Sequence, residues 1–397
     1  MDPVERFIRY AKIDTQADDT TGTTPSTEKQ KNLSRLLVEE FKELGLEDAH
    51  MDEYGIVYAH LKGEGDKIGF NAHVDTALEV TDENVNPQII NNYDGSDFHL
   101  NEKYVLSSKE FPTLKKHIGK SLVVTDGNTL LGADDKAGIA IIMSALEYIV
   151  SHPEIKHHNL SIAFTVDEEI GEGPLHFDVK KMDADYAYTI DGGDIAEIDS
   201  ENFNARGVKV HIEGVSVHPG EGKNALINAA LLLNEFINKL PAGETPFEAG
   251  PDDGYWHINT INGSSDVIDL SMILREFDQD KLDARTNHIL SIGKELQIKY
   301  PKAKVEVTIK DQYENMKPYL AKCPKVIEVA EAALRKNGIE PIHSKIRGGT
   351  DGATFSKMGL PTPNLGTGSS NHHGRFEYLV IEDFKKMIDV VIDIMKI

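Results

Sequence analysis

The feature that most constrains this chain is a set of short apolar runs that each end in acidic side chains. Three of them are FNAHVD at 70–75, FTVDEE at 164–169 and YTIDGG at 188–193. Each has the length of a strand and is bounded by turn residues. Between the first two lies LLGADDKAGIAIIMSALEYI, where apolar residues recur at helical spacing from Ile139 to Ile149. This alternation predicts an α/β core with a central sheet, in which sites gather where strands end.

The length of the chain predicts two domains. Its 397 residues exceed the roughly 250 to 300 at which a single core stops growing. From Arg206 onward the pattern changes to strand, helix, two strands, helix, strand, which is typical of a ferredoxin-like βαββαβ domain. We therefore predict a large domain made of residues 1–205 and 313–397, with a smaller domain of residues 206–312 inserted between its halves.

Composition narrows the classes of partner. Forty-two Lys and Arg against 66 Asp and Glu give a net charge of -24, which disfavours nucleic acid and anionic membranes. The single cysteine, Cys323, excludes an internal disulfide and a thiolate zinc site. Charged residues occupy the N-terminal stretch where a secretory signal needs an apolar segment. We expect a soluble, cytoplasmic protein, and the sequence leaves monomer and homodimer open.

Two segments near the N-terminus carry local predictions. Ser26 or Thr27 is placed to cap a helix whose apolar face includes Leu33, Leu37 and Phe41. The stretch from 76 to 128 is long and polar, which is unusual in a compact domain unless it serves a function. We expect it to border an active site.

Several polar residues at the strand ends are candidates for chemistry. His73 and Asp75 are two positions apart on a strand, so their side chains point the same way and the carboxylate could orient the imidazole. Asp134 and Asp135 open a helix, where helix capping is an equally simple role. The acidic run that begins at Asp167 could be only a solvated strand end.

Taken together, these residues have the chemistry of a hydrolytic metal site. Asp191 ends a further strand, and His373 lies in a loop rich in Gly, Ser and Asn, where a histidine could also be an ordinary surface residue. Two histidines and several carboxylates without cysteine suit a hydrolytic zinc site with open positions. Carboxylates can also bridge two metal ions.

The ordered set of motifs resembles the peptidase T family of zinc aminotripeptidases, within the superfamily of di-zinc aminoacylases and carboxypeptidases. The motifs are HVDT, LLGADDKAGIA, FTVDEE, YTIDGG, VHPG, RGGTDGA and NHHG. PSTE and NVNPQIINNYDG are also present, and the broader superfamily does not generally carry them. The resemblance runs from end to end. It implies that the large domain is catalytic and that the inserted domain is a lid.

The resemblance also implies a role for each candidate. His73 and Asp191 would bind one zinc ion, Glu169 and His373 would bind the other, and Asp134 would bridge the two. Asp75 would orient His73, and Glu168 would be the general base and acid. His218, Arg275 and Arg347 would contact the substrate, His218 by stabilising the oxyanion and the arginines by holding the peptide or its carboxylate. The substrates would be short peptides, preferentially tripeptides, from which the N-terminal residue is released.

Other functions fit parts of the same pattern. A dipeptidase, a carboxypeptidase or an N-acyl amino acid hydrolase could use the same metal ligands. A catalytically silent peptide-binding protein would not need Glu168. Nucleotide binding through RGGTDG or GTGSSNHHG is disfavoured because neither has the lysine that a phosphate loop requires.

Overall fold

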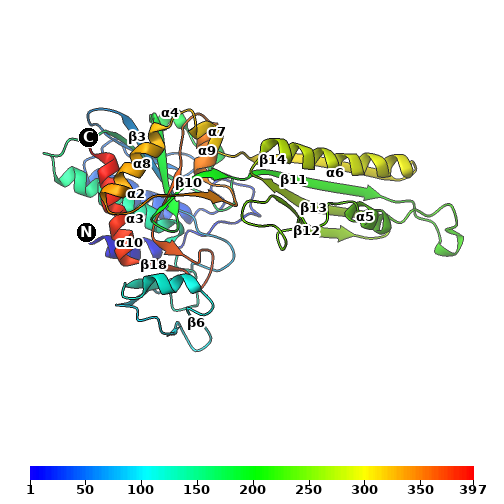
Figure 1. The fold of residues 1–397 in the computed structure, drawn as a ribbon, viewed down its shortest axis with the longest axis horizontal. Helices are drawn as coiled ribbons and strands as arrows, with labels where there is room; N and C mark the ends of the chain where they lie inside the picture. Colours follow the sequence, from blue (N-terminus) through cyan, green and yellow to red (C-terminus); the bar gives the residue numbers. More distant parts are fainter. The chain divides into compact units, whose positions relative to one another are not determined.

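A computed structural model describes residues 1–397, which fall into two compact units. The first unit comprises Met1–Ser200, Met316–Lys345 and Thr350–Ile397, and the second comprises Glu201–Asn315 and Ile346–Gly349. Figure 1 labels the elements of both units. Since the chain leaves the first unit and returns to it, the first unit is built from separate stretches of sequence.

The first unit is organised around a mixed sheet of eight strands. Four central strands, β8, β3, β9 and β16, are parallel, and antiparallel strands flank them. Because three of these strands end beside one another, the residues that follow β8, β3 and β9 meet at one edge of the sheet. The strands in spatial order are β1 (His50–Met51), β2 (Val57–Leu61), β8 (Asn159–Thr165), β3 (Lys67–His73), β9 (Tyr186–Gly192), β16 (Asn364–Gly366), β10 (Glu197–Asn202) and β15 (Ile342–Ile346).

Helices bury the apolar residues of these strands. The helix α3 packs on β3 and β9, and its residues Ile139, Ile142, Leu146 and Ile149 are buried, as their spacing predicts. None of the helices combines the length and hydropathy needed to cross a bilayer. The helices of this unit are α1 (Pro3–Ala11), α2 (Gln30–Glu43), α3 (Ala133–Ser151), α4 (Val179–Met182), α7 (Lys317–Leu320), α8 (Lys325–Lys336), α9 (Asp351–Lys357), α10 (Ile381–Met395) and the short 3-10 turn η2 (Gly173–His176).

The predicted cap of α2 is wrong. The helix begins at Gln30 without a side-chain cap, and Leu33, Leu37 and Phe41 are buried on it as expected. Ser26 instead donates its hydroxyl and its backbone N–H to the carboxylate of Asp167, at 2.5 and 2.6 Å. Asp167, which binds Ser26 in place of the helix end, lies far away in the sequence, so local capping rules could not identify it.

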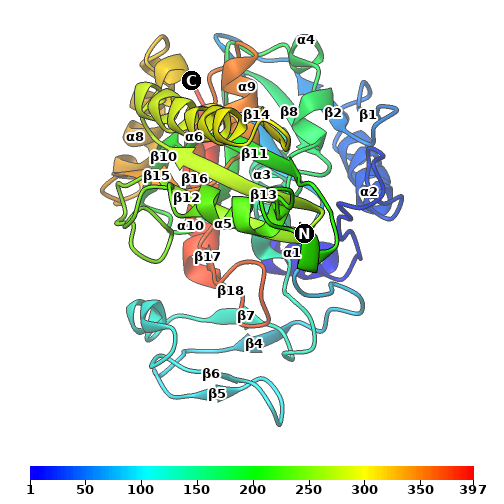
Figure 2. The same cartoon turned by 90° about the vertical axis from the view of Figure 1, so that its right-hand side faces the viewer.

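The long polar stretch forms a small subdomain with the C-terminal tail. It contains β4 (Gln88–Ile90), β5 (Phe98–His99), β6 (Val105–Leu106), η1 (Pro112–His117) and β7 (Leu122–Val124). Strands β4 and β7 join β18 (Tyr378–Val380) and β17 (Ser369–Ser370) in one sheet, and Figure 2 shows cyan β7 beside red β18. Leu100, Leu106, Leu114 and Tyr378 share a buried core. The stretch therefore anchors the tail that carries His373.

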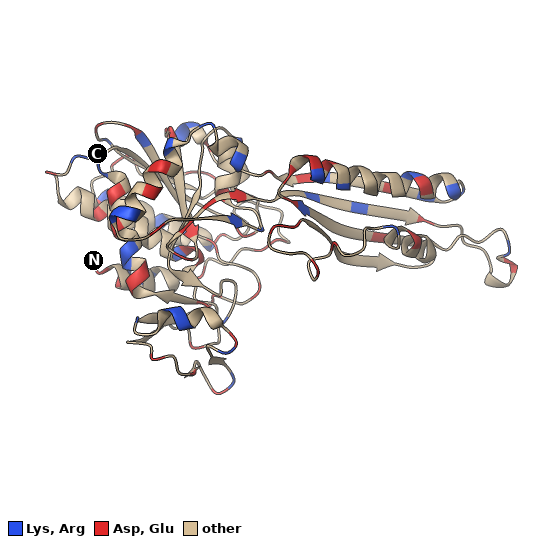
Figure 3. Ribbon diagram, viewed as in Figure 1, with Lys and Arg blue, Asp and Glu red and all other residues tan.

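The second unit has the predicted βαββαβ order. Its antiparallel sheet runs β12-β13-β11-β14, the strand order of a ferredoxin-like fold. Apolar residues of α5 and α6 pack with those of the strands in one core. Acidic and basic residues both occur along α6, as the red and blue segments of the ribbon show (Figure 3). The elements are β11 (Asn204–Glu213), η3 (Pro219–Glu221), α5 (Ala229–Ile237), β12 (Tyr255–Gly263), β13 (Val267–Glu276), α6 (Gln279–Lys299) and β14 (Lys304–Tyr313).

Candidate metal centre

One side of the candidate centre is made by His73 at the end of β3, Asp191 near the end of β9 and Asp134 at the start of α3. The Nε2 atom of His73 lies 3.1 Å from Oδ1 of Asp134 and 3.4 Å from Oδ1 of Asp191. All three side chains are largely buried. A histidine nitrogen and two carboxylate oxygens therefore converge on one point at the edge of the sheet.

The other side uses the second oxygen of the same aspartate. The Nε2 atom of His373 lies 3.4 Å from Oδ2 of Asp134 and 3.1 Å from Oε2 of Glu169. Asp134 thus directs one oxygen toward each histidine. Of the residues that the sequence singled out as metal ligands, all five lie in this cluster, which belongs entirely to the first unit.

Asp134 and Asp135 are neighbours in the chain, but their carboxylates make different contacts. Both residues have non-helical backbone angles at the start of α3, and the peptide between them is cis. Asp135 accepts the backbone N–H of Gly138 at 3.2 Å through Oδ1, which is a helix-capping bond, and that of His73 at 3.1 Å through Oδ2. The capping role considered for the pair thus applies to Asp135. Asp135 also forms a group with His73 and Asp191 whose ligand atoms lie within 4.8 Å of one another, but both of its oxygens already accept backbone N–H groups.

Asp75 supports the site through the backbone as well as through His73. Its Oδ1 atom lies 3.4 Å from Nδ1 of His73, and that nitrogen is 3.1 Å from the main-chain carbonyl oxygen of Asp75. The two carboxylate oxygens accept the backbone N–H groups of Glu168 and Glu169, each at 3.1 Å. Asp75 therefore fixes the histidine and the acidic pair relative to each other.

Glu168 lies beside the cluster without being part of the two histidine–carboxylate groups. Burial raises its pKa well above the usual range, and the neighbouring carboxylates of Asp191, Asp351 and Glu169 act in the same direction, whereas His73 opposes them. A carboxyl group in such surroundings has an increased affinity for a proton, as a general base requires.

The donor set fits divalent metal ions. Oε1 of Glu169 is buried and has no hydrogen-bond partner, although a buried carboxylate oxygen is costly to leave unpaired. Burial raises the pKa of Asp191 to about 7 and that of Glu169 to about 7, with the charge of Asp134 adding to both. Cations placed between these carboxylates and the histidines would satisfy the orphaned oxygen and offset the crowding of negative charge.

We expect the metal-free protein to lose stability as the pH rises from about 5 to about 8. In this range the unfolded chain has released its carboxyl protons and then its histidine protons. The folded chain keeps these carboxyl protons until the pH approaches 7, because the pKa values of Asp191 and Glu169 are about 7. It keeps the His373 proton throughout, because hydrogen bonds to Asp134 and Glu169 raise the pKa of His373 to about 11. Melting temperatures in chelator would measure the trend, which added metal should suppress. A rise in melting temperature across this range without metal would contradict the prediction.

The three predicted substrate residues belong to the second unit. His218 is exposed and accepts the backbone N–H of Gly220 at 3.2 Å, at the start of η3. Arg275 donates to Oε1 of Gln312 at 2.8 Å and lies over the ring of Tyr313. None of these contacts identifies a substrate group, so the assigned roles stay predictions.

Arg347 is held by neighbours within the same unit. It donates to the carbonyl oxygens of Gly250 and Pro251, the latter at 2.7 Å, and its guanidinium lies over the rings of Phe203 and Tyr255. In this structure the arginine fastens the loop before β12. Its proposed contact with a peptide also stays a prediction.

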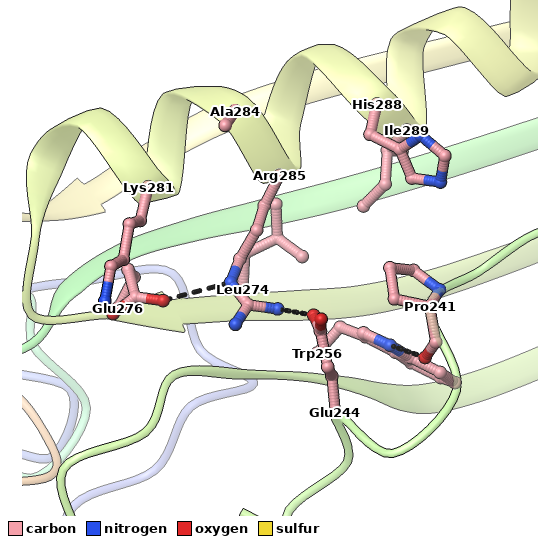
Figure 4. A pocket seen from close by; sticks show the side chains of 10 residues that line it. All are labelled: Pro241, Glu244, Trp256, Leu274, Glu276, Lys281, Ala284, Arg285, His288 and Ile289. Carbon is pink, nitrogen blue, oxygen red and sulfur yellow. Dashed lines mark hydrogen bonds and ion pairs between the residues drawn. The ribbon is translucent and has the colours of Figure 1, made fainter.

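The second unit contains a pocket of about 310 Å³, and none of the five candidate metal ligands lines it. Figure 4 shows Arg285 paired with Glu276 and Glu244, and the indole N–H of Trp256 donated to the carbonyl of Pro241. These polar groups of the pocket are already paired with one another. Both glutamates of the pocket are thus paired with Arg285, and neither belongs to a group whose ligand atoms converge on one point.

Two supporting residues were not predicted from the sequence. Asp167, which has a left-handed backbone conformation with φ 53°, accepts the side-chain amide of Gln30 in addition to the bonds from Ser26. Glu377 is almost fully buried and binds the loop that contains Asp134. The only sequence signal for Glu377 is an isolated acidic residue four positions after His373, which is weak in so acidic a chain.

The fold and the paired histidine–carboxylate groups define an α/β protein with the ligand chemistry of a divalent-metal site. The family model described as Peptidase family M20/M25/M40 matches residues 123–397, and the chain belongs to this family. Its similarity extends further, because it is 49% identical to Peptidase T of Clostridium perfringens strain 13 over 99% of this chain and 98% of the relative. The resemblance inferred from the motifs is confirmed.

Solved structures show the same fold. The aminopeptidase PepT of Bacillus cereus superposes with a TM-score of 0.78 at 24% identity, over 99% of this chain and 97% of that one. A tripeptidase from Staphylococcus aureus superposes with a TM-score of 0.79 at 23% identity, with the same coverage. The predicted α/β class with a central mixed sheet is therefore confirmed.

Proposed function

We propose that this protein is a metallo-aminopeptidase that releases the N-terminal residue from short peptides, preferentially tripeptides. The observation that carries the proposal is the position of Asp134, with one carboxylate oxygen facing His73 and the other facing His373. Two ligand groups that share one carboxylate suit a pair of metal ions, an arrangement used by aminopeptidases. The names of the relatives, Peptidase T, aminopeptidase and tripeptidase, support the same activity.

The ligands divide into two sets around Asp134. His73 and Asp191 would hold one ion, and Glu169 and His373 would hold the other. We propose zinc, because imidazole and carboxylate ligands without thiolate suit a hydrolytic zinc site. When bound, such ions lower the pKa of water and polarise a carbonyl group.

The protein's own residues then manage the proton. Glu168 takes a proton from the attacking water on its carboxylate and later delivers it to the nitrogen of the departing amine. Asp75 keeps Glu168 in place by accepting its backbone N–H at 3.1 Å. The raised pKa of Glu168, caused first by burial, favours the protonated form that the second transfer needs.

His218, Arg275 and Arg347 are proposed to contact the peptide, on the basis of sequence resemblance. His218 would stabilise the developing oxyanion, and the arginines would bind the peptide or its terminal carboxylate. Kinetics of the three alanine variants on one free tripeptide, with metal content as the control, test these roles. Unchanged kcat and KM in all three variants would reject them.

The substrate class is tested by a peptide length series. We expect a free tripeptide to be cleaved faster than the matching dipeptide and tetrapeptide, and its N-acetylated form to be refused, because an aminopeptidase must bind a free amine. Comparing kcat/KM across the series, with the released residue identified, measures this preference. Release of the C-terminal residue, or faster hydrolysis of an N-acyl amino acid, would favour the carboxypeptidase or acylase alternative. No turnover of any substrate by the metal-loaded protein would favour a silent binding protein.

A further inference from the structure

The buried carboxylate of Glu377 binds the backbone at the start of α3, next to the side chain of Asp134. Oε2 of Glu377 accepts the backbone N–H groups of Leu131 and Gly132, each at 2.8 Å. Oε1 of the same side chain accepts the backbone N–H of Asp134 at 3.0 Å. Glu377 is only 1% exposed, so these bonds are shielded from water.

Both oxygens of Glu377 are required by this geometry. The three N–H groups precede the first regular turn of α3, where backbone donors have no partner within the helix. Gly132 has a left-handed conformation with φ 74°, which turns the chain so that successive N–H groups face one side. A charged acceptor binds such donors more strongly than a neutral one. A glutamine would place its NH2 group against at least one of the backbone N–H groups.

The same residue connects the segment that carries Asp134 with the segment that carries His373. Glu377 lies four positions after His373, directly before β18, which pairs with β7 and β17. Arg375, between them, donates to the carbonyl oxygen of Asn128 at 2.7 Å. The tail is thus bound to the chain on the N-terminal side of Asp134 at two points.

We infer that Glu377 is a positioning residue for the metal pair, which fixes the carboxylate of Asp134 between His73 and His373. Its role complements those of Asp75 and Asp135, whose carboxylates bind the backbone of Glu169 and His73. Three carboxylates thus hold the main chain of three ligands. The inference rests on the proposed metal ligands.

The test compares E377Q with a matched control, E382Q. Glu382 follows in the same tail and also accepts a backbone N–H through both oxygens, at 2.8 and 3.0 Å, but from Ser121 alone. A glutamine can satisfy one N–H group with its single oxygen. The affinity of each variant for zinc is measured by competition with a chromophoric chelator, and the melting temperature of each metal-free protein is measured separately.

We expect E377Q to weaken the binding of both ions by roughly 10- to 100-fold, the usual effect of removing an outer-shell partner. E382Q should match the wild type. Wild-type affinity in E377Q, with or without a lower metal-free melting temperature, would overturn the inference, and so would an equal loss of affinity in E382Q. If E377Q does not fold, E377D replaces it. E377D keeps the charge but is too short to reach all three donors, so weaker binding supports the inference and wild-type affinity overturns it.

The wild-type measurement separates this inference from the proposed function. Two bound ions in the wild type with unchanged affinity in E377Q would overturn only the role of Glu377. Failure of the wild type to bind metal would overturn the ligand assignment itself, and the positioning role with it.

Discussion

Replacement of Glu168 by glutamine is expected to lower kcat by roughly a hundred- to ten-thousand-fold, the usual contribution of a general acid–base group. Glutamine has almost the same shape as glutamate but cannot accept the proton of the attacking water. The backbone N–H of residue 168 would still be held by Asp75, so the metal ligands should keep their positions. Metal content and metal-free melting temperature should therefore stay close to the wild type while turnover falls.

The control for this variant is E172Q. Glu172 lies in the same loop but is exposed, and its backbone N–H is bound to the carbonyl oxygen of Asp167. E172Q should retain wild-type kcat. If E168Q retains more than about a tenth of the activity, where general-base loss should cost at least about a hundredfold, another group is the base. A loss of metal in E168Q would instead make Glu168 a ligand.

The fold could be predicted largely because apolar patterning is local. The spacing of apolar residues within α3 predicts a helix by itself. The apolar runs of β3, β8 and β9 likewise have the length of strands. The βαββαβ order of the second unit is similarly visible in alternating residues. Ser26 shows the limit of such reasoning, since its partner Asp167 is 141 residues away in the sequence and outcompetes a helix cap.

The candidate site, too, could be predicted only in part from the sequence. Spacing predicted that the side chains of His73 and Asp75 approach each other on one strand. Asp75 instead lies two residues beyond the end of β3, but its Oδ1 atom is 3.4 Å from Nδ1 of His73. Spacing alone could not decide whether Asp134 or Asp135 faces the metal, because both open the same helix. The resemblance singled out Asp134, and the contacts of Asp135 support that choice, since its two oxygens accept the backbone N–H groups of Gly138 and His73. Glu377 could not be predicted from the sequence, because it accepts the backbone N–H of a residue more than 240 positions earlier in the chain.

Removal of the carboxylate of Asp134 should disrupt both metal positions at once. In D134A, His73 would lose Oδ1, which lies 3.1 Å from its Nε2 atom, and His373 would lose Oδ2, which lies 3.4 Å from its Nε2 atom. We expect affinity for both ions to fall by more than the roughly 10- to 100-fold that outer-shell changes cost, with hydrolysis falling in parallel. Metal content per chain, after equilibration at a fixed free zinc concentration, measures the effect.

The comparison variant is H373A, which removes a ligand from one side only. It should chiefly weaken the ion held by Glu169 and leave the ion held by His73 and Asp191 in place. Two-step competition curves would distinguish the variants, since H373A should displace one step and D134A both. If each variant loses one ion and keeps the other at wild-type affinity, Asp134 serves a single position. Its two oxygens would then require a different explanation, with Oδ2 bound to a positively charged His373 in place of a metal ion.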